Sequence, residues 1–288
     1  MSRLEIKFIL PLLDDEDEEV YKVVKEKVLN TGPKSIPILE DALDSANTLL
    51  QHERIGSMIF QLKMQQMKDN IISWIHSDNK SLQEGWILIS SVQGIEISPQ
   101  IIEKLMHQII TKIWIELNPH QTSFEKISII NKIFFDLYGF KINYTDKSAI
   151  EDFFIDKIFI SRTGNRLTLN MLYAIISRKL NLPLMPLNIN NKILLAYYDP
   201  VLSREAFSDI THPFLFFIDV ENKGRIIGVR EFDFLLKENQ LTWNPDLTLS
   251  NKDMIKRLLI KLKDVSFILK DKEKVLLAED LLRNFDHY

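Results

Sequence analysis

Cysteine is absent from all 288 residues of the chain. Disulfide bonds, thiolate metal sites and catalysis by a cysteine nucleophile are therefore excluded, because each of them requires the sulfur atom. A protein without disulfides gains nothing from an oxidising compartment, so the expected location is the cytoplasm.

The sequence also lacks long apolar runs and a strong charge bias. No run approaches the roughly 18–20 apolar residues that span a bilayer. The first 20 residues do not have the pattern of a signal peptide, because Pro11 interrupts their apolar core and acidic residues follow at once. With 36 Lys and Arg against 40 Asp and Glu, the formal net charge is −4. A generally basic face for nucleic acid is therefore not expected.

Several motifs that bind cofactors or metals are missing. Neither GxxxxGK[ST] nor GxGxxG occurs, so nucleotide binding has no support. The 6 histidines are scattered, with no HExxH motif and no two of them four residues apart. We therefore expect neither a metal site nor a cofactor.

What is present in residues 1–118 reads as short amphipathic helices. The acidic run at 14–19 suits a helix start, where the helix dipole favours negative charge. Gly32 and Pro33 then end that helix. Its predicted apolar stripe is Val20, Val23, Val24 and Val28. The pattern resembles a HEAT-type repeat, although no regular period is found. We expect Trp74, Trp86 and Trp114 to pack between helices.

A new unit begins at the break Asn118-Pro119. Ser123 is the expected N-cap of its first helix, and Gly139 ends that helix. Residues 159–183, "FISRTGNRLTLNMLYAIISRKLNLP", then predict a turn followed by a long apolar helix. The expected core residues of that helix are Leu167, Leu169, Leu172, Ile175, Ile176 and Leu180.

After residue 183 the sequence consists of short runs of Ile, Leu, Phe and Tyr bounded by Pro, Asn, Gly and Asp. This pattern predicts the strands of an antiparallel sheet. Gly224 is available for a turn residue with positive φ. The last segment predicts a pair of helices joined by a short polar turn. The apolar face of the first helix is Ile255, Leu258, Leu259, Leu262 and Val265.

Three segments in order carry a family resemblance: "SRTGNRLTLNMLYAIISRKLNLPL", "NINNKILLAYYD" and "FFIDVENKGRIIG". Together they resemble the bacterial SirB-type transglutaminase-like family. The resemblance implies an α+β protein in three parts. A helical, HEAT-like region is expected over 1–118, a papain-like transglutaminase core with a small antiparallel sheet over 119–240, and a tetratricopeptide-like helical hairpin over 241–288.

Active members of such families use a Cys-His-Asp triad, in which a thiolate attacks an amide carbon and the histidine moves the proton. By the resemblance, the cysteine position falls at Arg166, the histidine position at Lys192 and the acid position at Asp219. Only the acid is kept. Asn165, Thr168 and His212 are the expected lining of the former cleft.

Two functions follow from these positions. The first is non-catalytic: a pseudoenzyme that binds a protein or peptide partner, with Arg166, Lys192 and Asp219 forming either an anion site or a structural salt bridge. The second is a hydrolase or acyl-transfer enzyme with a hydroxyl nucleophile, Thr168 or Ser161, and with Lys192 or His212 as its base. The missing cysteine and histidine favour the first.

Overall fold

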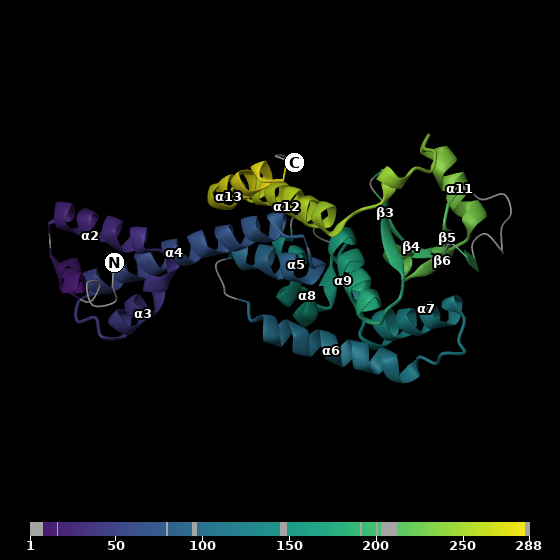
Figure 1. Cartoon of the computed structure of the whole chain (residues 1–288), viewed down its shortest axis with the longest axis horizontal. Coiled ribbons are helices and arrows are strands. Elements are labelled where there is room, and N and C mark those ends of the chain that lie inside the picture. Colours follow the sequence, from purple (N-terminus) through teal and green to yellow (C-terminus); the bar gives the residue numbers. More distant parts are fainter. Residues whose placement is uncertain are drawn as a thin grey trace. The chain divides into compact units, whose positions relative to one another are not determined.

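The structure is a computed structural model that describes residues 8–15, 17–78, 80–93, 97–144, 149–190, 192–199, 201–202 and 212–285. The chain divides into two compact units, Met1–His76 and Ser77–Tyr288 (Figure 1). The second unit begins well before residue 119, because two helices that follow residue 80 pack on the helix at residues 166–179. The domain boundaries after residues 118 and 240 stay predictions.

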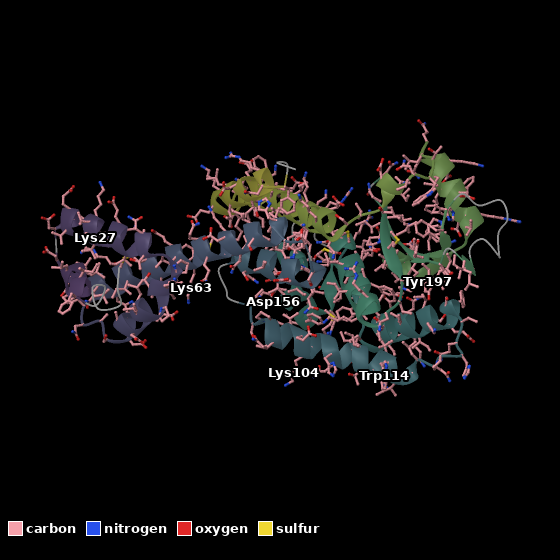
Figure 2. The ribbon with its side chains drawn as sticks, in the orientation of Figure 1. Lys27, Lys63, Lys104, Trp114, Asp156 and Tyr197 are labelled. Carbon is pink, nitrogen blue, oxygen red and sulfur yellow. The ribbon has the colours of Figure 1, made fainter. Side chains whose placement is uncertain are left out.

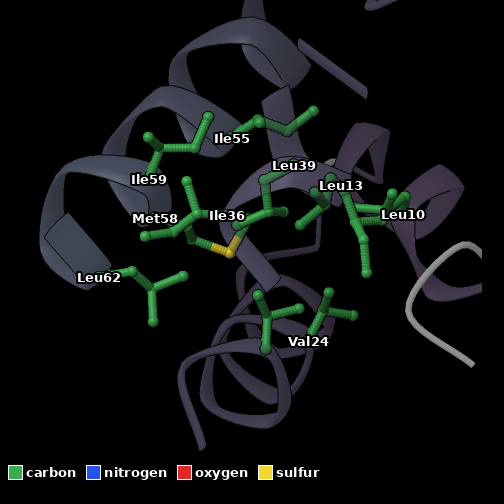
Figure 3. Close-up of a cluster of buried hydrophobic side chains, with 11 residues drawn as sticks. Leu10, Leu13, Val24, Ile36, Leu39, Ile55, Met58, Ile59 and Leu62 are labelled. Atoms are coloured by element: carbon green, nitrogen blue, oxygen red, sulfur yellow. The ribbon is translucent and has the colours of Figure 1, made fainter. Parts of the chain in front are cut away.

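The first unit is helical. Its elements are η1 (Leu10–Asp14), α2 (Glu18–Thr31), η2 (Pro33–Ser35), α3 (Ile36–Asp44) and α4 (Leu49–His76). The helices α2 and α3 pack against α4 around a shared apolar cluster (Figure 3). As predicted, α2 ends at Gly32, whose φ is 75°. Val24 and Val28 are buried, but the placement of Val23 in the same stripe was wrong, because that side chain is 51% exposed.

The second unit is built around one buried helix, α9 (Arg166–Lys179). Every residue from 167 to 177 is buried, as expected of a helix that is covered on all sides. The predicted core residues of α9 are confirmed, except that Leu180, just beyond it, is partly exposed. Packed in the same unit are α5 (Leu82–Ser90), η3 (Ser91–Gln93), α6 (Pro99–Glu116), α7 (Ser123–Asn131), the π-helical turn η4 (Lys132–Leu137), η5 (Ile150–Phe153) and α8 (Ile155–Ser161).

Two local predictions in these helices need correction. The N-cap of α7 is Thr122, one residue before the expected Ser123, because Thr122 and Glu125 form a reciprocal capping box. Trp74 and Trp86 are buried, but Trp114 is 68% exposed on α6 (Figure 2). The buried face of α6 is formed instead by Ile102, Met106, Ile109 and Ile113.

The predicted antiparallel sheet is confirmed. It contains β3 (Leu184–Ile189), β4 (Lys192–Tyr198), β5 (Phe214–Asp219) and β6 (Arg225–Ile227), in that order. The helix α11 (Val229–Glu238) packs on β5. A short parallel pair, β1 (Lys141–Ile142) with β2 (Thr163–Gly164), lies apart from this sheet. The turn η6 (Val220–Asn222) connects β5 toward β6, and Gly224 has the predicted positive φ, 73°.

The chain ends in the predicted helical pair. After η7 (Pro245–Leu247), the helix α12 (Asn251–Ile268) packs against α13 (Lys272–Arg283). All five residues predicted for the apolar face of α12 are buried. The predicted α+β class is therefore confirmed. Among the helices of the described residues, none combines the length and the apolar character needed to cross a membrane.

Candidate functional site

Three elements meet where the resemblance places the triad. The antiparallel register pairs Leu195 of β4 with Ile218 of β5, so the start of β4 lies beside the end of β5. The turn η6, which follows β5 directly, contacts α9. As a result Lys192, the first residue of β4, and Asp219, the last of β5, lie at the same end of the sheet.

Lys192 and Asp219 form a direct ion pair. The Nζ atom of Lys192 lies 2.6 Å from Oδ2 of Asp219. The Asp219 side chain is completely buried, whereas that of Lys192 is 34% exposed. Nδ2 of Asn222 donates a second hydrogen bond, of 2.7 Å, to the same oxygen. A buried carboxylate requires such partners, because removing it from water is costly.

Arg166 does not join that pair but binds a second carboxylate. Its Nε lies 3.2 Å from Oε2 of Glu221 in η6. The Arg166 side chain is 60% exposed, while that of Glu221 is only 11% exposed. Burial raises the pKa of Glu221; the charge of Arg166 lowers it, that of Asp219 raises it and that of Lys192 lowers it. The site is therefore a cluster of two cations and two carboxylates.

Arg166, Lys192, Asp219 and Glu221 together form a four-charge cluster. In each of its two carboxylates, one oxygen is paired with a cation and the other accepts no hydrogen bond within the described residues. Within the described part of the chain, Oδ1 of Asp219 and Oε1 of Glu221 are buried and accept no hydrogen bond. Nζ of Lys192 donates to Asp219, and an ammonium has no lone pair to offer as a general base. The four side chains of the cluster form two ion pairs, and none of the four is placed as a nucleophile.

Asn165 and Thr168 belong to the same region but serve the helix. They cap α9 reciprocally: Oδ1 of Asn165 accepts from the backbone N of Thr168, and Oγ1 of Thr168 accepts from the backbone N of Asn165, both at 3.0 Å. Thr168 is completely buried, and its hydroxyl donates to the carbonyl oxygen of Asp152 at 2.8 Å. With its proton held by a carbonyl, Thr168 is poorly placed as a nucleophile.

Ser161 and His212 lie outside the cluster. Ser161 ends α8, and its hydroxyl bonds the backbone N and the Oγ1 of Thr163 at 3.1 and 2.9 Å. His212 precedes β5, at the opposite end of that strand from Asp219, and β5 alone spans roughly 17 Å at about 3.3 Å per residue. The structure does not bring His212 to the positions of Lys192 and Asp219.

His212 instead packs in a cluster of aromatic side chains. Its ring centroid lies 5.5 Å from those of Phe214, Phe217 and Phe232 and 6.0 Å from that of Trp243. Burial lowers the pKa of His212, and the charge of Asp233 opposes this in part. This environment favours the neutral ring. The surroundings are those of a core histidine.

Sequence reasoning missed Glu221 and Asn222. Both follow Asp219 within three residues, so the string "DVEN" contains the signal. A turn that immediately follows a strand can fold its polar residues back over the strand's last side chain, as η6 does here. The sequence did not indicate that Arg166 would pair with Glu221 rather than with Asp219.

A buried polar chain supports this turn from behind. The hydroxyl of Tyr173 in α9 donates to Oδ1 of Asn131 in α7 at 2.8 Å. Nδ2 of Asn131 then donates to the carbonyl oxygen of Gly224 at 2.7 Å. Burial raises the pKa of Tyr173, which keeps its hydroxyl protonated as the donor. These two hydrogen bonds connect α9, α7 and the β5–β6 turn.

No group of three or more His, Asp and Glu side chains among the described residues could hold a metal ion.

The sequence of this chain is similar to a known protein family and to longer known proteins. The family model described as the Transglutaminase-like superfamily matches residues 100–260. The F-box only protein 21 of Homo sapiens is 27% identical over 113 residues, which cover 39% of this chain and 17% of that protein. That of Mus musculus is 26% identical over the same shares. The chain thus spans less than a fifth of the length of these relatives. No solved structure matches it.

Proposed function

This chain belongs to the transglutaminase-like superfamily, and we propose that its domain is a non-catalytic module that binds a protein or peptide partner. In this proposal it is a pseudoenzyme of the SirB-type branch. The four-charge cluster occupies the place of the lost triad and serves recognition and packing instead of acyl transfer.

One observation carries the proposal: the ion pair of 2.6 Å between Lys192 and the buried Asp219. In an active triad the acid orients a histidine, and the histidine takes a proton from the nucleophile. Here the acid neutralises an ammonium, and Arg166, which offers only donors, stands at the nucleophile position. The meeting of the helix start with the two strand ends therefore supports a fold that is kept without its chemistry.

Two features favour a macromolecular partner. The Arg166 side chain is 60% exposed, and its guanidinium offers further N–H donors to a carboxylate or a carbonyl besides the Nε that faces Glu221. The matched relatives contain a similar segment as a small part of a much longer chain, which suits a module that works beside others. The helical segments on either side of the core would present further surface to such a partner.

The competing function is acyl transfer by Thr168 or Ser161. It is less well supported, because the Thr168 hydroxyl is buried and donates to a backbone carbonyl. Ser161 lies in a turn with Thr163. Of the two expected bases, His212 is packed among aromatic rings and Lys192 is paired with Asp219.

An affinity capture from the native cell extract, with mass spectrometry, tests the proposal. Wild type is compared with Arg166→Glu, and with Arg230→Glu on α11 as a matched change of an exposed arginine. We expect at least one protein to be retained by wild type and Arg230→Glu and lost with Arg166→Glu. Retention by all three would move partner binding away from the former cleft.

The enzymatic alternative needs its own assay. Purified wild type is incubated with a glutamine-containing peptide and a fluorescent primary amine, and ammonia release and amine incorporation are measured. We expect neither above the buffer blank. Turnover that disappears in Thr168→Val or Ser161→Ala would overturn the non-catalytic assignment and establish the competing function.

A further inference from the structure

A concave surface lies away from the four-charge cluster, within the second unit. It is a groove of about 680 Å³ between the first turns of α5 and α6 and the last turn of α9. Its lining is mostly apolar, with Leu82, Ile87, Leu88, Pro99 and Ile175 as the main contributors. Grooves that bind small molecules are usually of this size, apolar and provided with a few polar groups.

The polar residues of the groove hold its walls together. Nε2 of Gln83 in α5 donates to Oε2 of Glu103 in α6 at 2.7 Å. Nζ of Lys179 in α9 lies 2.7 Å from Oε1 of the same carboxylate. Hydrogen bonds from Lys179 and Gln83 lower the pKa of Glu103, so this acid stays ionised. The charge of Lys179 is thereby neutralised within the wall.

Arg178 differs from Lys179, because no carboxylate in the described residues pairs with it. Its side chain is exposed at the groove, and NH1 donates to Oδ1 of Asn251 at 3.1 Å. Asn251 is fixed in turn, since its Nδ2 donates to the carbonyl oxygen of Lys80 at 2.6 Å. A guanidinium held on one side by a neutral amide keeps its remaining N–H donors for a ligand.

We propose that this groove binds a small amphiphilic anion, with its apolar body against Leu82, Ile87 and Ile175 and its carboxylate on Arg178. The carboxylate end of the ligand is expected at Arg178, because Arg178 is the lining cation without a carboxylate partner in the part of the chain described. The apolar end then lies on the apolar wall of the groove. Glu84, an exposed acid in the first turn of α5, also lines the groove and opposes an anion.

Calorimetric titration of the full chain with decanoate, and separately with the uncharged 1-decanol, tests the inference. We expect wild type to bind decanoate more tightly than 1-decanol. Arg178→Gln should weaken decanoate binding about tenfold, the loss of one hydrogen-bonded charge contact, and leave 1-decanol binding unchanged. The matched control is Arg230→Gln on α11, which should bind both probes as wild type does.

Two further variants separate the groove from general effects. Leu88→Trp fills a partly exposed lining position and should abolish binding of both probes, while Glu84→Gln should tighten decanoate binding. Thermal unfolding checks that each variant is folded. If Leu88→Trp does not fold, the decanoate affinities of Arg178→Gln and Glu84→Gln test the inference without it. The inference is overturned if wild type binds neither probe, or if Arg178→Gln and Arg230→Gln bind decanoate equally.

Discussion

Nζ of Lys192 lies 2.6 Å from Oδ2 of Asp219, and the Asp219 side chain is completely buried. The first residue of one strand thus neutralises the last residue of its neighbour. A carboxylate at this depth is tolerated because an ammonium and the amide of Asn222 both bond the same oxygen.

Removing the ammonium should expose the cost of this burial. We expect Lys192→Met to lower the free energy of unfolding by about 1.5–3 kcal/mol, because Asp219 loses a charged hydrogen bond. Urea denaturation followed by circular dichroism measures the change. Lys237→Met, at an exposed position of α11, should stay within about 0.5 kcal/mol of wild type.

The double variant Lys192→Met/Asp219→Asn is the internal check. It removes the buried charge together with its partner, so it should be more stable than Lys192→Met alone. If Asp219→Asn brought no recovery, the lysine would be acting through its packing rather than through its charge.

Glu221 should make stability depend on pH in an unusual direction for an acid. Its pKa is raised, first by burial, above the ordinary value of 4.5. Above pH 4.5 the unfolded chain therefore loses this proton before the folded chain does, and the stability that Glu221 contributes falls as pH rises through its folded-state pKa. Glu221→Gln removes this loss, so its stability relative to wild type should increase from pH 4.5 to pH 8.

Urea unfolding at a series of pH values measures this difference directly. Glu238→Gln, an exposed glutamate on α11, controls for the loss of one acidic residue. The difference in free energy of unfolding between Glu221→Gln and wild type is then compared across the pH range. A constant difference would show that Glu221 titrates in the folded protein as it does in the unfolded chain.

The start and the middle of α9 should respond very differently to truncation. Leu172 is completely buried, so Leu172→Ala should cost about 2–5 kcal/mol through lost burial and a cavity. Arg166→Ala removes a side chain that is 60% exposed and should cost about 1 kcal/mol or less. Thermal or denaturant unfolding of both variants gives the order, and the reverse order would contradict the assignment of α9 as a core helix.

Gly224 should tolerate no side chain. Its φ is 73°, and a Cβ atom there would lie 2.0 Å from Oδ1 of Asn131, the atom that accepts from Tyr173. We expect Gly224→Ala to destabilise the protein by at least about 1–2 kcal/mol from the backbone conformation alone. The matched control is Gly228→Ala, where a Cβ atom meets nothing within 4 Å. Equal unfolding midpoints for the two variants would refute the close packing of this turn.

Much of the fold was predictable because local patterns point to it. Helical spacing marked α9 and α12, apolar runs between turn residues marked the strands, and Gly32 and Gly224 adopt the positive φ that their positions require. Errors arose where a local pattern has more than one solution. Ser123 and Thr122 are both good caps, and the capping box with Glu125 selected Thr122. Trp114 looked like a core residue, but α6 turns it to solvent.

The sequence by itself determined that this chain offers no thiol, because it contains no cysteine. The positions of Arg166 and Lys192 in a former triad stay predictions from the family resemblance. Tertiary structure alone decided how the charges pair: Lys192 with Asp219, Arg166 with Glu221, and Lys179 with Glu103. The reason is physical. An ion pair depends on a separation of a few ångströms and on burial, and both are set by the packing of segments that lie far apart in the chain.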